Sequence, residues 1–228
     1  MQQRQWVVIA KYALVVTGLF FLAYGSVLGI EAALGVSSWQ VLHIGLARHL
    51  PMTIGRSNQV VGVAVLAVAI ALGVRPAIGT WLNMLLVGYF VDLVMMRGMV
   101  PKAASLEARI IYVFLGIIIS SLGLAGYICA GLGAGPRDSL MLGVTRKTGW
   151  RFGPTRSTIE VSVVGAGYLL GGPVGVGTLL AALLTGPAVE KWMTMLAGLD
   201  RLPFLRDVIR IPAVVRLGRK EAAPGRAA

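Results

Sequence analysis

The sequence predicts an all-α, polytopic membrane protein built from two tandem repeats. Its residues are 57% hydrophobic and 13% charged, with a mean hydropathy of +0.80, a composition typical of membrane spans and not of soluble domains. The charged residues gather between and after the apolar runs, as they do at membrane surfaces. Glycines also recur at an offset of 98 residues without a gap, which indicates an internal duplication.

The duplication depends on residues that recur at this offset, including Thr80/Thr178 and Arg48/Arg146. Eight glycine pairs share it: Gly18/Gly116, Gly25/Gly123, Gly35/Gly133, Gly45/Gly143, Gly55/Gly153, Gly73/Gly171, Gly79/Gly177 and Gly88/Gly186. Chance would give roughly two such pairs. We therefore expect a first membrane repeat over 1–98, a second over 99–197, and a basic cytoplasmic tail over 198–228.

Six apolar runs predict the long transmembrane helices: about 6–28, 57–74, 76–96, 109–132, 157–172 and 174–197. Each is long enough, or nearly so, to cross a hydrocarbon core of ~30 Å as a helix. The first run follows Arg4 and could be mistaken for a signal peptide. It is longer than a usual signal segment and its repeat partner lies in mid-chain, so we expect a membrane helix.

Each half also contains one short segment, 35–48 in the first and 133–146 in the second. Ser37 or Ser38 can cap the first as a helix, and Pro136 suits the first turn of the second. A helix of ~13 residues is only ~20 Å long, which is short of a full crossing. Each segment is therefore either a re-entrant half-helix or a short span.

These two alternatives predict different topologies. Re-entrant segments give three crossings per half and inverted repeats, with 16 of the 21 Lys and Arg inside and five outside when the N-terminus is inside. Spanning segments give four crossings and parallel repeats, with only Arg75 and Arg137 outside. The positive-inside rule and matched basic pairs such as Lys11/Arg109 favour parallel repeats, whereas the segment length favours inverted ones. We expect parallel repeats, with both termini in the cytoplasm.

A candidate solute site lies where the two halves differ in polar residues. The differences cluster on the short segments and on the helices that open with Gly79-Thr80 and Gly177-Thr178. Helix N-termini such as these can bind anions, and repeat interfaces often hold transport sites. The expected substrate-binding residues are Trp39, Gln40, Thr80, Asn83, Arg137, Asp138 and Thr178.

Three acids within or near the apolar runs are candidates for a coupling-ion site, because an acid in a membrane span is costly. Asp92 and Glu190 occupy equivalent positions in the two halves, and Glu160 lies one turn into the fifth run. Each is either a coupling-ion ligand or a carboxylate paired with a nearby cation. Both interpretations stay open.

Other functional classes are not expected. His43 and His49 have no third ligand nearby in the sequence, so we expect no metal site. We find no nucleophile and base at a catalytic spacing and no nucleotide-binding motif, so we expect neither an enzyme nor a cofactor. The net charge of +12 indicates a cytoplasmic membrane surface and not nucleic-acid binding. The basic tail is expected either to lie on anionic lipid headgroups or to be a solvated tether.

Two motifs suggest a family. The second half contains Gly135, Pro136, Arg137, Asp138 and Leu140, then Gly143, Gly149 and Gly153, and later the Gly177-Thr178 pair. The first half keeps Leu34, Gly35, Trp39, Val41 and Leu42, but has Ser38 and Gln40 where the family pattern has Pro and Asp. In these residues the chain resembles the YczE/YitT-type bacterial membrane proteins, over nearly the whole membrane part. The resemblance implies a location in the inner membrane and a fold more than an activity.

Two functions remain open at this level. The duplication, the two short helices in matching positions and the repeat-equivalent acids favour a transporter or exporter of a small solute in the lipid bilayer. The alternative is a non-transporting scaffold that recruits a cytoplasmic partner through its basic tail.

Overall fold

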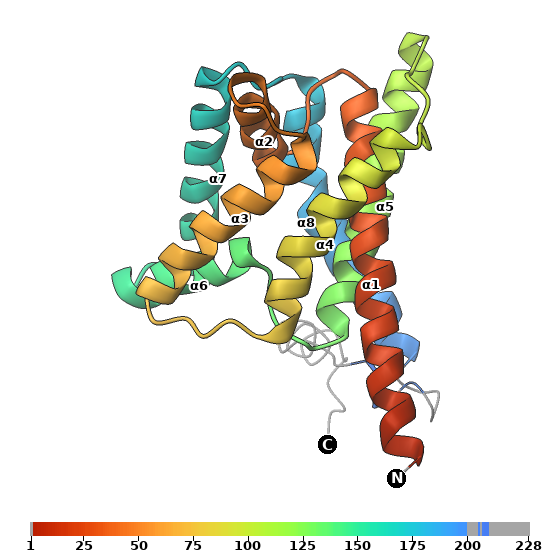
Figure 1. Ribbon diagram of the computed structural model, residues 1–228, viewed down its shortest axis with the longest axis vertical. Helices are drawn as coiled ribbons and strands as arrows, with labels where there is room; N and C mark the ends of the chain where they lie inside the picture. Colours follow the sequence, from red (N-terminus) through yellow and green to blue (C-terminus); the bar gives the residue numbers. More distant parts are fainter. Residues whose placement is uncertain (1, 200–204, 206, 210–228) are drawn as a thin grey trace, which may run out of the picture.

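The computed structural model describes residues 2–199, 205 and 207–209, and all of the regular structure in these residues is helical (Figure 1). The helices are α1 (Gln2–Glu31), α2 (Ser38–His49), α3 (Ile54–Ala71), α4 (Ile78–Met96), α5 (Leu106–Cys129), α6 (Pro136–Thr148), α7 (Phe152–Leu169) and α8 (Val176–Gly198). The predictions for the tail 198–228, lipid binding and partner recruitment, fall almost wholly outside the described residues.

Four of these helices, α1, α3, α4 and α5, are long and apolar enough to cross a membrane. The all-helical membrane fold is therefore confirmed, and the expected spans are confirmed at these four. Helices α7 and α8 have 18 and 23 residues but do not reach the same hydropathy. The polar side chains of α7, among them Arg156 and Glu160, explain the lower hydropathy of that helix.

The helix bounds repeat along the chain. For each helix of the first half, the first or the last residue lies 98 positions before that of its counterpart in the second half. For example, α2 begins at Ser38 and α6 begins at Pro136. Local signals account for several bounds: the Thr53 hydroxyl accepts a hydrogen bond from the Arg56 N–H at 3.1 Å, and α6 ends at Gly149, which has a positive φ of 73°. Capping hydroxyls and left-handed glycines are favoured at these places.

Helices α1 and α5, which occupy equivalent places in the two halves, run antiparallel. A Cβ added at Gly18 would lie 2.8 Å from the Gly123 carbonyl oxygen, and one at Gly116 would lie 2.8 Å from the Gly25 carbonyl oxygen. Figure 1 shows α1 rising from the N-terminus while α5 descends beside it. The expectation of parallel repeats is therefore wrong.

The short helices explain this correction, because both return to the end of the molecule from which their loops enter. Helix α2 lies near the end where α1 finishes and α3 begins, and α6 lies toward the opposite end (Figure 1). This placement is the one expected of the re-entrant alternative for the short segments. The matched basic residues of the two halves therefore lie at opposite ends of the molecule. Their similarity does not indicate that the two halves run in the same direction.

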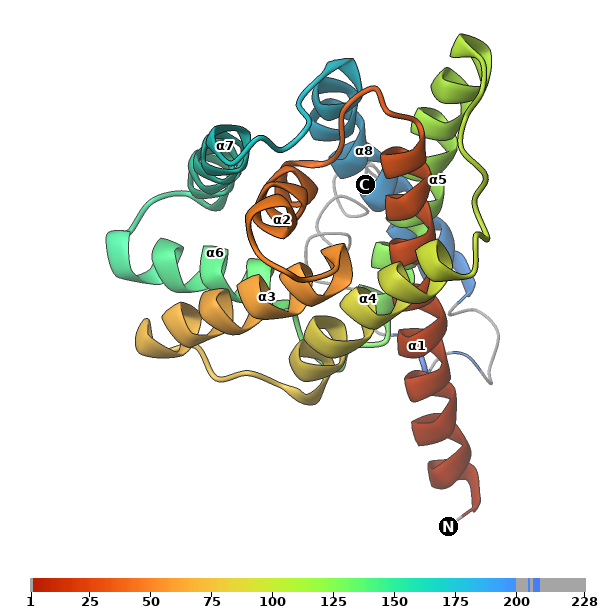
Figure 2. The same ribbon diagram turned by 45° about the horizontal axis from the view of Figure 1, so that its top comes forward.

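The helices form two groups. In the first, here called the central group, α5 packs against α1 and α8, and α1 packs against α4. In the second, the lateral group, α2 packs against α7 and α3 packs against α6, so each pair joins one helix from each half. Helix α3 also packs along α4 and connects the groups, whereas α7 and α8 barely contact each other within residues 152–198 (Figure 2).

The core of the central group is a row of apolar side chains at one-turn spacing on α1. Val15, Leu19, Ala23 and Val27 are almost fully buried and pack with Val87, Val91 and Val94 of α4 and with Tyr127 of α5. Side chains four residues apart share one helix face, so this stripe fixes which side of α1 meets its partners. The lateral group then lies against this packed central group.

Candidate functional site

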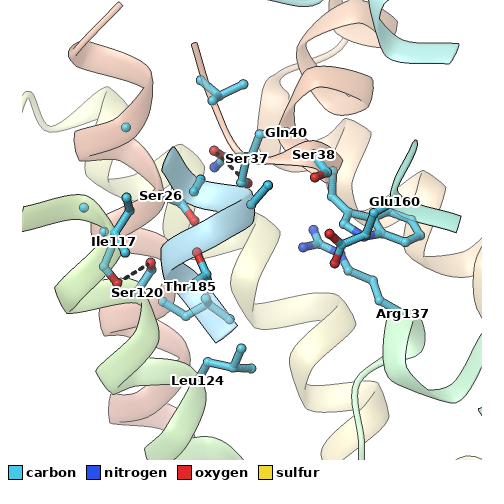
Figure 3. Close-up of a pocket in the computed structure, with 18 of the residues that line it drawn as sticks. Ser26, Ser37, Ser38, Gln40, Ile117, Ser120, Leu124, Arg137, Glu160 and Thr185 are labelled. Atoms are coloured by element: carbon cyan, nitrogen blue, oxygen red, sulfur yellow. Dashed lines mark hydrogen bonds between the residues drawn. The ribbon is translucent and has the colours of Figure 1, made fainter. Parts of the chain in front are cut away.

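A cavity of about 180 Å³ lies between the two groups and is lined by residues from all eight described helices. The central group contributes a wall of small and neutral polar residues. This wall includes Gly25, Ser26, Gly29, Asn83, Gly116, Ser120, Gly177, Ala181 and Thr185. Figure 3 shows Ser26, Ser120 and Thr185 on one side of the cavity, facing Arg137 and Glu160 on the other.

Both half-helices begin at this cavity. Ser37, just before α2, and Ser38, its first residue, line the cavity, as do Gly135, just before α6, and Arg137 in its first turn. The Ser37 hydroxyl donates to Gln40 Oε1 at 3.4 Å and does not cap α2, whose first turn contains no acid. The partial positive charge of the α2 N-terminus is therefore not offset by its own side chains. Uncapped N–H groups at a helix N-terminus form a site that favours anions.

The Arg137 guanidinium lies beside this helix end. Its Nη2 is 3.0 Å from Nε2 of the buried His43, and its central carbon lies 4.9 Å from the centre of the Trp39 ring. Both partners belong to α2, whereas Arg137 belongs to α6. Contact with an aromatic face and with one ring nitrogen holds the planar guanidinium in place, and its remaining N–H groups have no hydrogen-bond partner among the described residues.

Helix α7 adds a second cation and an acid. Arg156 Nε donates to Glu160 Oε1 at 3.0 Å, one turn apart. Among the described residues, four charged side chains line the cavity: Arg137, Asp138, Arg156 and Glu160. All four come from the second half, and their first-half equivalents at the 98-residue offset, Trp39, Gln40, Asn58 and Gly62, are uncharged. The cavity is therefore chemically asymmetric although the helices around it recur.

Most of the expected solute-site residues meet at this cavity. Trp39, Gln40, Asn83, Arg137 and Asp138 line it. These residues come from α2, α4 and α6, so the structure brings together positions that are up to 99 residues apart. Their roles in binding stay predictions.

Thr80 and Thr178 do not line the cavity. The Thr80 hydroxyl donates to the Ala134 carbonyl in the loop before α6 at 2.6 Å, whereas the Thr178 hydroxyl accepts from the Gly175 N–H at the start of its own helix, α8, at 3.2 Å. The neighbouring glycines bind the loops that precede both half-helices, because Gly79 N–H donates to Leu132 and Gly177 N–H donates to Leu34, at 2.9 and 2.7 Å. These contacts position α6 and α2 indirectly.

The three candidate coupling acids are separated. Glu160 lines the cavity. Asp92, on α4, contacts the start of α3, where its carboxylate accepts from the Thr53 hydroxyl at 2.5 Å and from the Gly55 N–H at 2.9 Å. Glu190, its equivalent, is exposed on α8. Only Glu160 therefore has a position from which it could act on a solute in the cavity.

Several lining residues were not identified from the sequence, namely Ser26, Ser37, Asn58, Ser120 and Thr185. Each is a single neutral polar residue in or beside a membrane helix, where serine and threonine are common and carry little signal. Asn58 is the exception, because its repeat equivalent is Arg156. A polar residue at matching positions in both halves could have marked that pair.

Comparison with known proteins places the chain in a family. Residues 9–194 match a family of unknown function, DUF6198. The chain is 37% identical over 180 residues to the uncharacterized membrane protein YczE of Bacillus subtilis (strain 168), covering 78% of this chain and 83% of that protein. It is 35% identical over 186 residues to an uncharacterized protein of Haemophilus influenzae, covering 82% and 84%, respectively.

A third relative is more distant. The uncharacterized protein YyaS of Bacillus subtilis is 26% identical over 188 residues, covering 80% of this chain and 92% of that protein. No solved structure matches the chain. The family match and the identity to YczE show that the chain belongs to the YczE-type family of membrane proteins.

Proposed function

We propose that the protein transports a small anionic solute across the bacterial inner membrane and binds it in the cavity between the central and lateral groups. The observation that carries this proposal is the meeting of the uncapped α2 N-terminus and the Arg137 guanidinium at one cavity. Half-helix N-termini at a repeat interface are the usual anion sites of secondary transporters. A guanidinium adds bidentate, charge-assisted hydrogen bonds to a carboxylate or similar group.

The proposed topology has six spans, α1, α3, α4, α5, α7 and α8, in two inverted repeats over 1–98 and 99–197. The recurrence of the helix bounds and the antiparallel α1 and α5 support it. With the half-helices re-entrant, 16 of the 21 Lys and Arg lie on the side of the N-terminus. The positive-inside rule then favours both termini in the cytoplasm.

The cavity also limits the solute. Its volume of about 180 Å³ is below the 300–1,000 Å³ typical of drug-sized ligand pockets, so the solute contains few heavy atoms. Arg156 and Glu160 pair with each other, and Asp138 lies in the first turn of α6, where an acid offsets the dipole of that helix. Arg137 and the α2 N-terminus remain for the solute anion, and Glu160 is the candidate coupling acid.

A flux measurement tests this function. The purified protein is reconstituted in liposomes, and uptake of labelled acetate, pyruvate, nitrate and phosphate is compared with uptake of methylammonium. We expect at least one anion to enter faster than in protein-free liposomes, and we expect Arg137→Gln to abolish that uptake because the remaining site lacks its free cation. Uptake of methylammonium alone, or anion uptake unchanged by Arg137→Gln, would contradict the proposal.

A further inference from the structure

The two groups are in close contact along one helix pair, α3 and α4. Gly55 and Gly88 face each other so closely that a Cβ on either would overlap the carbonyl oxygen of the other. Asp92 of α4 accepts hydrogen bonds from the Thr53 hydroxyl and the Gly55 N–H at the start of α3. Gln59 Nε2 donates to the Leu85 carbonyl at 2.9 Å, so polar contacts extend for two turns along this pair.

The equivalent pair, α7 and α8, is apart in this structure. A Cβ added at Gly153 or at Gly186, the counterparts of Gly55 and Gly88, would meet no atom within 4 Å. Arg151 and Glu190, the counterparts of Thr53 and Asp92, are both exposed. They form no ion pair in the part of the chain that the structure describes, and Arg151 gives α7 no side-chain cap.

The separated pair α7 and α8 nevertheless contains residues that could form the contacts seen between α3 and α4. Glycines on both helices permit close backbone contact, and Ser157 provides a hydroxyl at the position of Gln59. At the helix ends, a hydroxyl–carboxylate contact in the first half is replaced by residues of opposite charge in the second, Arg151 and Glu190. A carboxylate at residue 190 could also accept from the Gly153 N–H, as Asp92 accepts from Gly55.

We propose a second conformation in which α7 docks on α8 through Gly153 and Gly186, Arg151 pairs with Glu190, and α3 separates from α4. This second proposal rests on the proposed transport function and adds a conformational change to it. The second conformation closes the cavity at one end and opens it at the other. Helix α7 begins at the end of the molecule from which α1 rises, whereas α3 begins at the opposite end (Figure 1). The lateral group therefore rocks against the central group.

The connections between the groups suit such a motion. The chain passes from one group to the other between α1 and α2, α3 and α4, α5 and α6, and α7 and α8. Each of these loops contains a glycine with positive φ: Gly35 at 101°, Gly73 at 84°, Gly133 at 127° and Gly171 at 73°. A few loop residues that absorb backbone rotation are what a hinge requires. An exposed ion pair is weak, which suits a contact that must form and break.

Cysteine cross-linking in membranes tests the second conformation without any solute. All variants carry Cys129→Ala, which removes the single native cysteine. The paired changes Arg151→Cys and Glu190→Cys place thiols at the proposed contact, and Thr53→Cys with Asp92→Cys place them at the observed one. We expect oxidation to form a disulfide in both pairs, because thiols that come within bonding distance even transiently are trapped.

The matched control pairs Glu190→Cys with Val161→Cys, ten residues further along α7 and so roughly 15 Å away. Disulfide formation by the 151/190 pair that does not exceed this control would overturn the proposal. Gly186→Leu provides a second measurement, because it fills space that is open in this structure but would block docking. It should abolish the 151/190 disulfide and leave the 53/92 disulfide, and an unchanged 151/190 yield would overturn the proposal.

The two proposals can fail separately. A chain that forms both disulfides but transports none of the four probe anions would contradict the proposed solute and support the second conformation. A chain that transports an anion but forms only the 53/92 disulfide would support the solute and overturn the α7–α8 contact.

Discussion

At the scale of single residues, the contacts of Arg137 hold its guanidinium in a defined orientation at the cavity. Its guanidinium stacks on Trp39 and contacts His43, which is 1% exposed. Because a guanidinium presents several donors in one plane, a stacked ring leaves its edge for an anion. The position of this edge beside the α2 N-terminus gives the site two sources of positive potential that act on the same point.

This arrangement predicts that Arg137→Lys weakens anion binding although it keeps the charge. A lysine ammonium has neither the planar donor pair nor the stacking on Trp39, so we expect the apparent Kd for acetate or nitrate to rise roughly tenfold. Quenching of Trp39 fluorescence measures it in a chain whose other four tryptophans are phenylalanine. Arg146→Gln, at an exposed site on the same helix, should leave the Kd unchanged; an equal loss there would indicate a general charge effect.

The sequence predicted six of the lining residues, five for solute binding and Glu160 as a coupling acid, but not how they meet. Mismatches between the halves, such as Trp39 against Arg137, marked the positions, because a repeat comparison detects what differs. The cation–π contact between those same two residues joins equivalent positions of opposite halves. Such a contact depends on how the halves fold around each other, and no pattern within one half contains that information.

At the scale of helices, the contact between α1 and α5 depends on glycine. Gly18 meets Gly123, and Gly25 meets Gly116, so each glycine pairs with the partner of its neighbour and not with its own repeat equivalent. Close backbone contact of this kind stabilises helix pairs in membranes, where apolar side chains gain little from leaving lipid. The glycines that revealed the duplication therefore also form the interface between the two halves.

We predict that Gly18→Ala destabilises the protein whereas Gly29→Ala on the same helix does not. The added methyl group at Gly18 would lie 2.8 Å from the Gly123 carbonyl oxygen, but at Gly29 no atom lies within 4 Å. Overpacking costs about 1–3 kcal/mol, while alanine gains about 1 kcal/mol over glycine in a helix. Thermal unfolding in detergent should show a lower Tm for Gly18→Ala only; equal shifts in both variants would contradict the close α1–α5 contact.

The helix bounds show what hydropathy could and could not predict. The runs 57–74 and 109–132 each begin and end three residues later than α3 and α5. The first turn of α3 contains Gly55 and Arg56, which belong to the helix but lie before the apolar run. After α3, Leu72 and Val74 remain apolar although the chain has already turned at Gly73, which has a positive φ. Backbone geometry ends these helices, and hydropathy does not record it.

At the scale of the whole molecule, the direction of the halves decides where the two short helices lie. Antiparallel halves place one half-helix toward each end of the molecule (Figure 1) and let both begin at a common cavity. Parallel halves would place both half-helices on the same side. The charge pattern was a poor guide here, since both arrangements put most Lys and Arg on the side of the N-terminus and differ only in a few loops.

These loops provide the final prediction. The loop between α4 and α5 and the loop between α2 and α3 lie at the end opposite the N-terminus, whereas the last turn of α6 lies toward the other end (Figure 1). These segments contain the exposed residues Ala104, Pro51 and Thr148, respectively. In a Cys129→Ala chain, a cysteine at 104 or 51 should react with a membrane-impermeant maleimide in intact cells. A cysteine at 148 should react only after permeabilisation. Six crossings with re-entrant half-helices require this pattern, whereas eight crossings would place residues 51, 104 and 148 all in the cytoplasm. Protection of cysteines at 104 and 51 in intact cells would therefore contradict the inverted arrangement. It would also contradict the rocking of α7 onto α8, which depends on that arrangement.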